Sequence, residues 1–297
     1  RVSRSRHHMA KKKVIFDTNI FSTEHFPVLE ASKLKDLVYR KKILILSPAI
    51  LYEQILHLWL NDKKRPLLFQ YLPFLLDLKH QQHFHDRGTI ITMELEKDTP
   101  SREDYFLSLA EKGHRETQIN KQILQAKPDI FEQIQLKLLT GKHKQQRDNF
   151  RMILSKIRKT MSEQNKKFNS ERSANFENIF SRLGESMAET LIDIFYGGTL
   201  DKNILLNNWK TNKGKYPFLT FWIRAFLYIA FHAATNNNTE LDADAQNDVD
   251  FIVCMKEGNI LVSEDQRFMK DTFNHFWGGS EKQLLRIQDF VSLIATF

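Results

Sequence analysis

The chain has 297 residues, of which 41% are hydrophobic and 27% are charged. That length suits one large domain or two modest ones, and the composition excludes an intrinsically disordered chain. No apolar run reaches the ~20 residues of a membrane-spanning helix and no signal peptide is recognisable, so we expect no membrane partner. The single cysteine, Cys254, excludes an intramolecular disulfide and a cysteine-based zinc site, and it favours a reducing cytoplasm.

Residues 1–8, RVSRSRHH, are typical of an expression-vector remnant, and Met9 is the expected natural start. Three arginines in this segment belong to the formal charge of +8, which leaves +5 for the rest of the chain. A basic excess of this size is compatible with nucleic acid binding but does not by itself indicate it.

Short apolar strands alternate with helices near both ends of the chain. In order, the patterns predict a strand at 14–16, a helix at 28–39, a strand at 43–46, a helix starting with Ser47 as N-cap and Pro48 as its first residue, and a helix at 66–78. The far end predicts a helix at 248–257, a strand at 260–262, a helix at 266–272, a strand at 284–287 and a helix at 290–295. Buried strands separated by helices predict an α/β fold with a central parallel sheet that is split between the two ends of the chain.

The composition changes between residues 97 and 212, where Gln, Lys, Glu and Asn dominate and strand patterns are absent. Ser101-x-x-Asp104 and Lys127-Pro128-Asp129 predict helix starts, and Gly141 predicts a helix end. We therefore expect an α/β core formed by residues 9–96 and 213–297, with a mainly α-helical insertion at 97–212.

Two carboxylates follow predicted strands closely. Asp17 comes directly after strand 14–16, and Asp265 comes soon after strand 260–262. Because ligands of parallel α/β sheets bind beyond the carboxyl ends of the strands, we expect both side chains at the same sheet edge.

Two further acids lie on predicted helices. Glu53 belongs to the helix after the second strand, and Asp248 opens a late helix whose apolar residues would turn it toward the rim of the sheet. Asp250 competes with Asp248, but residues two apart on a helix point ~200° apart, so both cannot face one pocket. Packing favours Asp248.

Converging carboxylates repel one another unless a cation is present, and oxygen ligands without Cys or His favour Mg²⁺ or Mn²⁺ over zinc. Such a site holds one or two ions, activates a water and stabilises the pentacovalent phosphate of phosphodiester hydrolysis. Each acid also has a structural alternative as a helix cap, a first-turn acid or a solvated side chain. The coincidence of all four in order favours the metal site.

These motifs resemble those of the PIN-domain ribonucleases. Asp17-Thr18-Asn19 is similar to the family's D-T-N or D-x-S/N motif at the end of strand one, and Ser263-Glu264-Asp265 to its T/S-x-D motif. Glu53 and Asp248 stand where the family has its second and third acids. The sequence QDFVSLI at 288–294 also resembles the closing strand-to-helix passage of the family.

The resemblance covers roughly the first 80 and the last 60 residues. It implies a flavodoxin-like three-layer α/β/α sandwich and a metal-dependent endonuclease, usually acting on RNA. The catalytic and metal-binding residues would be Asp17, Glu53, Asp248 and Asp265, with Asn19, Ser263 and Asp250 as supporting polar groups. The insertion departs from the family, which leaves open the substrate, a homodimer, and a protein inhibitor or complex partner in a toxin or defence role.

Residues 142–172 carry ten Lys and Arg against three acids, a net charge of +7. This exceeds the +5 of the natural chain, so the remainder is slightly acidic. Such asymmetry favours contact with a phosphate backbone, with RNA as the first candidate and DNA as the second. The candidate contacts are Lys142, Lys144, Arg147, Arg151, Lys156, Arg158 and Lys159. An ordinary solvated helix face is the structural alternative.

Other motifs support weaker hypotheses. A haloacid-dehalogenase phosphatase would need an Asp where Asn19 stands, and GGSEK at 278–282 lacks the spacing of a phosphate-binding loop. Three histidines at 80, 83 and 85 beside Asp86 suggest a metal cluster, but a solvated linker is the better interpretation. The leading hypothesis is an endoribonuclease. The alternatives are a flap- or single-strand-type DNA nuclease and a non-catalytic RNA-binding protein with a PIN-like core.

Overall fold

The computed structural model describes residues 11–97, 101–125, 172–235, 245–266 and 268–297, together with Met152 and Ser155. The chain divides into two compact units, one formed by residues up to 84 and from 254 onward, the other by residues 85–253. The expected insertion lies within the second unit. That unit also includes residues 85–96 and 213–253, which the sequence patterns assign to the core.

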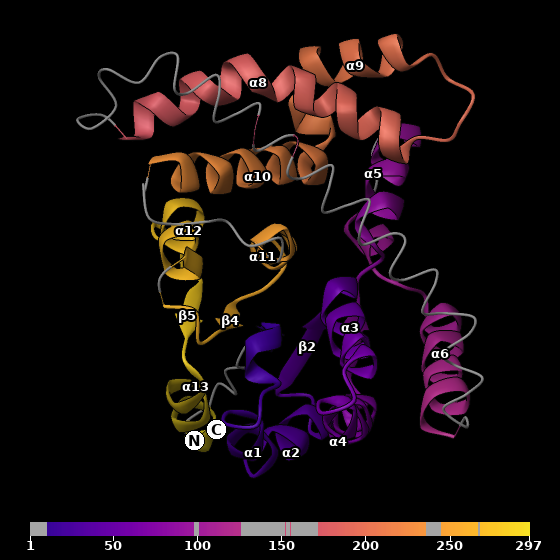
Figure 1. Cartoon of the computed structure of the whole chain (residues 1–297), viewed down its shortest axis with the longest axis vertical. Helices are drawn as coiled ribbons and strands as arrows, with labels where there is room; N and C mark the ends of the chain where they lie inside the picture. The colour runs from indigo at the N-terminus through magenta and orange to yellow at the C-terminus, as the bar shows by residue number, and fades with distance from the viewer. Residues whose placement is uncertain are drawn as a thin grey trace, which may run out of the picture. The chain divides into compact units, whose positions relative to one another are not determined.

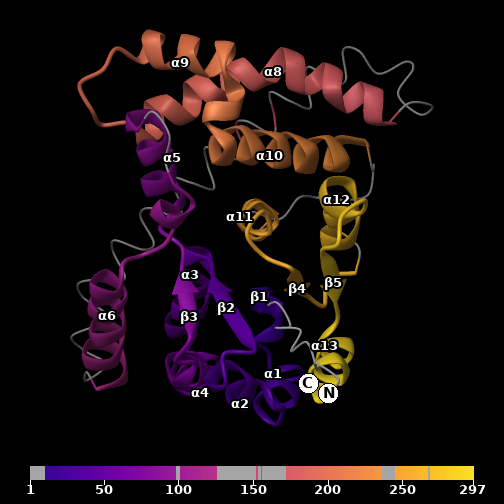
Figure 2. The same cartoon turned by 180° about the vertical axis from the view of Figure 1, so that it is seen from behind.

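The first unit contains a five-stranded, all-parallel sheet of order β3-β2-β1-β4-β5. Its strands are β1 (Lys12–Phe16), β2 (Ile43–Ser47), β3 (Gln81–His83), β4 (Ile260–Val262) and β5 (Gln283–Leu285). In Figures 1 and 2 the indigo-to-purple strands of the N-terminal part share this sheet with the yellow strands of the C-terminal part. The predicted α/β fold with a parallel sheet divided between the chain ends is confirmed.

Helices alternate with the strands of the first unit, consistent with an α/β/α arrangement. They are α1 (Phe26–Glu30), α2 (Leu34–Tyr39), α3 (Ala49–Leu56), α4 (Arg65–Asp77), α12 (Phe268–Trp277) and α13 (Ile287–Ala295), with short 3-10 helices η1 (Thr18–Ile20) and η2 (His57–Leu60).

Strand β1 lies in the middle of the sheet and is buried on both faces. Residues 14–16 are fully buried, as an uninterrupted apolar run in a parallel sheet requires. The ring of Phe16 packs edge-on against Phe290, with centroids 5.4 Å apart. Ile15, on the opposite face, lies close to Gly258, where an added Cβ would come within 3.1 Å of Ile15 Cδ1.

The single helix predicted at 28–39 is wrong, because the chain forms α1 and α2 with a break around Ser32. The hydroxyl of Ser32 donates to the carbonyl of Leu29 (2.6 Å) and accepts from the N–H of Leu34 (3.3 Å). A serine that bonds locally in this way competes with helical backbone hydrogen bonds.

The predicted start of the next helix is also wrong, by one residue. Pro48 is the N-cap and the helix begins at Ala49, while Ser47 is the last residue of β2. The backbone of Ser47 pairs in register with His83, and its hydroxyl donates to Gln81 Oε1 (3.2 Å). Sheet pairing thus takes Ser47 away from helix capping.

Strand β3 replaces the solvated linker expected around His83. His83 is fully buried and stacks on the ring of Tyr52, with centroids 5.0 Å apart. Gln81 is also buried; its carbonyl accepts from the hydroxyls of Ser47 and Tyr52 (both 3.2 Å) and its amide donates to the carbonyl of Leu75 (2.7 Å). Side-chain hydrogen bonds make a polar segment fit a buried strand.

The regular elements described in the second unit are helices. They form α5 (Arg87–Glu96), η3 (Arg102–Tyr105), α6 (Leu109–Gln118), the π-helix η4 (Ile119–Leu124), α8 (Arg172–Phe195), α9 (Lys202–Thr211), η5 (Lys213–Lys215), α10 (Pro217–Thr235) and α11 (Ala245–Cys254), whose last residue reaches the boundary. Helix α8 packs against both α9 and α10, as both views show. None of the described helices combines the length and apolar character needed to cross a membrane.

A buried carboxylate organises the centre of the second unit. Glu94 of α5 is fully buried; it accepts from the hydroxyl of Tyr105 (2.6 Å) and from the N–H groups of Phe218 (2.7 Å) and Leu219 (2.9 Å). The negative charge thus lies at the N-terminus of α10, where the helix dipole stabilises it. Burial, followed by the adjacent charge of Glu94, raises the pKa of Tyr105.

Candidate active site

The central strand β1 ends at Asp17. The backbone N–H of Asp17 donates to the carbonyl of Val262 at the end of β4 (2.9 Å). Because Phe16 and Val262 are in register, Asp17 and Ser263 become neighbours although 246 residues separate them. The first and the last part of the chain therefore meet at one edge of the sheet.

Three side chains hold the Asp17 carboxylate. The hydroxyl of Ser263 donates to Oδ2 (2.6 Å), the amide of Asn19 donates to the same oxygen (2.7 Å), and the hydroxyl of Thr18 donates to Oδ1 (3.3 Å). Ser263 Oγ accepts in turn from Asn19 Nδ2 (3.1 Å) and from the N–H of Asp265 (3.1 Å). A hydroxyl has one donor and two acceptor positions, so the capacity of Ser263 is used in full and its proton points at Asp17.

Burial dominates the electrostatics of Asp17, which is 3% exposed. Loss of solvent raises the pKa of its carboxyl above the ordinary value of 3.8, and the hydrogen bonds from Ser263 and Thr18 oppose this rise. The described hydrogen-bond partners of the carboxylate are all neutral. A bound cation would therefore stabilise the ionised form of Asp17.

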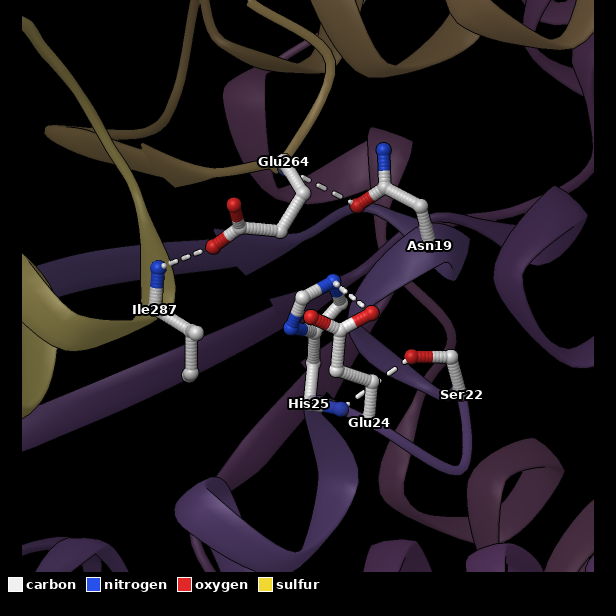
Figure 3. Close-up of polar contacts among 6 residues, drawn as sticks. All are labelled: Asn19, Ser22, Glu24, His25, Glu264 and Ile287. Atoms are coloured by element: carbon white, nitrogen blue, oxygen red, sulfur yellow. Dashed lines mark hydrogen bonds and ion pairs between the residues drawn. The ribbon is translucent and has the colours of Figure 1, made fainter.

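The loop after β4 brings Asp265 and Glu264 to the same edge. Asp265 is half-buried and is linked to Ser263 through its backbone N–H. The N–H of Glu264 donates to Asn19 Oδ1 (3.1 Å), and its carboxylate accepts from the N–H of Ile287 at the start of α13 (2.8 Å), as Figure 3 shows.

Glu53 lies in α3, the helix that follows β2, and is half-buried. It belongs to the same unit as Asp17 and Asp265. Strand β1 lies between β2 and β4, so Glu53 follows one of its neighbours and Asp265 follows the other.

The two candidates for the third acid lie in α11, within the second unit. Asp250 forms a two-pronged ion pair with Arg87, with Nε–Oδ1 at 2.9 Å and Nη2–Oδ2 at 2.6 Å, and it accepts from Trp222 Nε1 (2.9 Å). The guanidinium of Arg87 also lies over the Trp222 ring, 4.6 Å from its centroid. Asp250 therefore fastens α11 to α5 and α10, which leaves Asp248 as the better candidate for a metal ligand.

The acids match a divalent metal in chemical type but do not form a complete cluster. Carboxylate oxygens are the ligands that Mg²⁺ and Mn²⁺ prefer. Among the described residues, no three His, Cys, Asp or Glu side chains converge closely enough to hold an ion. This finding also covers the histidines at 80, 83 and 85 with Asp86, whose carboxylate caps α5 through the N–H of Thr89 (3.1 Å).

Glu264 is the residue at this edge that sequence reasoning passed over. The T/S-x-D pattern treats the middle position as a spacer, and nothing in the sequence links Glu264 to the N–H of Ile287, 23 residues away. The candidate nucleic-acid contacts between Lys142 and Lys159, and the expected helix boundaries at Lys127 and Gly141, lie outside the described residues.

No protein-family model matches this chain, and no match is found among curated proteins or among solved structures.

Proposed function

We propose that this protein is a metal-dependent endoribonuclease with a PIN-like three-layer core. The observation that carries the proposal is the buried carboxylate of Asp17, which ends the central strand of a parallel sheet and has neutral hydrogen-bond partners. The D-T-N and S-E-D motifs that meet there are those on which the family resemblance rests. A buried carboxylate whose described partners are neutral, at a ligand-binding sheet edge, is suited to a cation.

In this proposal Asp17, Glu53 and Asp265, which belong to one unit, hold Mg²⁺ or Mn²⁺, while Asp248, in the other unit, stays the sequence-based candidate for a fourth acid. When bound, the ion would supply charge stabilisation for the phosphate and a more acidic water. Ser263 and Asn19 hold the Asp17 carboxylate in one orientation through hydrogen bonds to Oδ2. The basic segment at 142–172 would contact the RNA backbone.

The test is cleavage of labelled single-stranded and structured RNA and DNA with Mn²⁺, comparing the wild type with Asp17→Asn. An amide fits the site, because its oxygen can accept from Ser263 and its NH₂ can donate to Thr18. We expect cleavage to fall at least 10²-fold while the fold is kept. Asp36→Asn, which changes an exposed acid of α2 paired with Arg40, is the matched control and should stay active. Full activity of Asp17→Asn would refute the site.

A non-catalytic RNA-binding protein with the same core is the second candidate, favoured by the missing acidic trio among the described residues. It predicts salt-dependent RNA binding, no cleavage by any variant and no Mn²⁺ affinity. The DNA arms of the same assay test a DNA-directed nuclease, which would prefer junctions or single strands.

A further inference from the structure

We infer that Glu264 is a positioning residue that fixes the geometry of Asp17 and Asp265 by tying the loop after β4 to the N-terminus of α13. This inference rests on the proposed function and deepens it. Glu264 would act through its neighbours, since its carboxylate is engaged by the N–H of Ile287 (2.8 Å).

Helix α13 offers a rigid anchor for this contact. Ile287, Phe290 and Ile294 are buried, and the ring of Phe290 packs against Phe16 at the end of β1. The first N–H groups of a helix have no partner within the helix, so a carboxylate that accepts from one of them is held by both a hydrogen bond and the helix dipole. Glu264 therefore connects the loop after β4 to a fixed point of the core.

The constraint passes from Glu264 to Asp17 through Asn19. The N–H of Glu264 donates to Asn19 Oδ1 (3.1 Å), which determines the side of the amide that carries the oxygen. The NH₂ group of Asn19 must then point toward Asp17 Oδ2 (2.7 Å) and Ser263 Oγ (3.1 Å). A shift of Glu264 would disturb this amide and, with it, the orientation of the Asp17 carboxylate.

The same loop also fixes Asp265, the residue next to Glu264. Its N–H donates to Ser263 Oγ, which donates to Asp17 Oδ2. Ser263 thus links the two acids by hydrogen bonds, while Glu264 joins this network through Asn19 and reaches α13 through Ile287, as the close-up in Figure 3 shows. Groups that orient the ligands of a metal typically change its affinity by about 10–100-fold when removed.

The experiment measures Mn²⁺ binding to the full chain by calorimetry. Glu264→Ala should weaken Mn²⁺ binding about tenfold or more, whereas Glu264→Gln, which keeps the acceptor oxygen, should restore most of the affinity. Asp289→Ala is the control, because it removes an exposed acid from the first turn of α13 and leaves the buried face of the helix and the polar network intact, so its Mn²⁺ affinity should equal that of the wild type. Equal binding by Glu264→Ala and wild type would overturn the inference, as would equal weakening by Asp289→Ala.

A second readout requires no metal. In ¹⁵N NMR spectra of the metal-free protein, the side-chain amide signals of Asn19 should move in Glu264→Ala and stay near their wild-type positions in Glu264→Gln. Unchanged Asn19 signals in Glu264→Ala would overturn the inference by themselves. If the Asn19 signals move in Glu264→Ala but the wild-type protein binds no Mn²⁺, the positioning contact is supported and the proposed metal site is rejected. The failure of the inference and the failure of the proposed function are therefore distinguishable.

Discussion

At the residue scale, Asp17 combines a structural cost with the proposed chemistry. Its buried carboxylate is held by three neutral donors, and burial raises its pKa above 3.8. The protonated form is therefore favoured in the folded protein relative to the unfolded chain. A cation would reverse this preference, which fits a residue selected for binding rather than for stability.

The sign of this effect gives a pH prediction for the metal-free protein. Because the folded pKa of Asp17 is raised, its contribution to stability is fully present below about pH 4 and is lost as the pH rises through the folded pKa. Asp17→Asn has no ionisable group at this position, so its stability does not fall with pH for this reason. The free energy of unfolding of the variant minus that of the wild type should therefore grow with pH, measured by urea denaturation in EDTA from pH 4 to 8. A difference that is flat or that shrinks with pH would contradict the assignment.

At the element scale, the turn that ends α2 has a lysine, Lys41, at a position where glycine is usually preferred. The N–H of Lys41 donates to the carbonyl of Val38 (3.0 Å) and the N–H of Lys42 to that of Leu37 (2.9 Å), which is the hydrogen-bond pattern of a Schellman motif. Lys41 has φ of 59°, a left-handed conformation in which glycine is preferred because it has no Cβ.

Lys41→Gly should therefore raise the free energy of unfolding by about 0.5–1 kcal/mol. Lys42→Gly is the matched control one residue later. It should lower stability, because it adds backbone freedom and removes the contact from Lys42 Nζ to the carbonyl of Phe297 (2.6 Å). Both changes are read by chemical denaturation, and a loss of stability in Lys41→Gly would show that the conformation is not strained.

The two acids of α11, Asp248 and Asp250, should have different effects when replaced, one on activity and the other on stability. Asp250→Asn breaks a nearly buried ion pair and leaves the charge of Arg87 uncompensated, so it should lower the free energy of unfolding by about 3 kcal/mol. Asp248→Asn, in the first turn, should cost at most about 1 kcal/mol but should reduce cleavage as Asp17→Asn does. The measurements are urea denaturation and the RNA assay run below the midpoint of the less stable variant. The reverse pattern would exchange the two assignments.

The sequence predicts those elements that apolar side chains define. Strands β1, β2 and β4 appear as short apolar runs, so their places and the parallel sheet follow directly. Strand β3 does not, because Gln81 and His83 are buried through hydrogen bonding and ring stacking with residues of α3 and β2. The break between α1 and α2 is hidden for a similar reason, since Ser32 acts through its own local hydrogen bonds.

At the scale of the whole molecule, the sequence predicts that Asp17 and the loop after β4 share a sheet edge, because parallel strands have their carboxyl ends at the same edge. It does not predict the Glu264 contact with α13, which depends on tertiary packing. The sequence also indicates only part of the division into two units. It shows that the middle of the chain is helical, but it assigns α5 and α10 to the α/β core. In the structure, contacts of Glu94 and Arg87 join these helices to the second unit.

The pairing of β1 with β4 also has a consequence for how this protein is made on the ribosome. Strand β1 has its β2 neighbour after some thirty residues, but its other edge stays open until residues 260–262 have been synthesised. For most of translation an apolar strand therefore exposes unpaired backbone groups, which invites association with other nascent chains. Closing such a distant contact is also slow. The protein should thus depend on chaperones until its last strands emerge, even if the finished fold is stable.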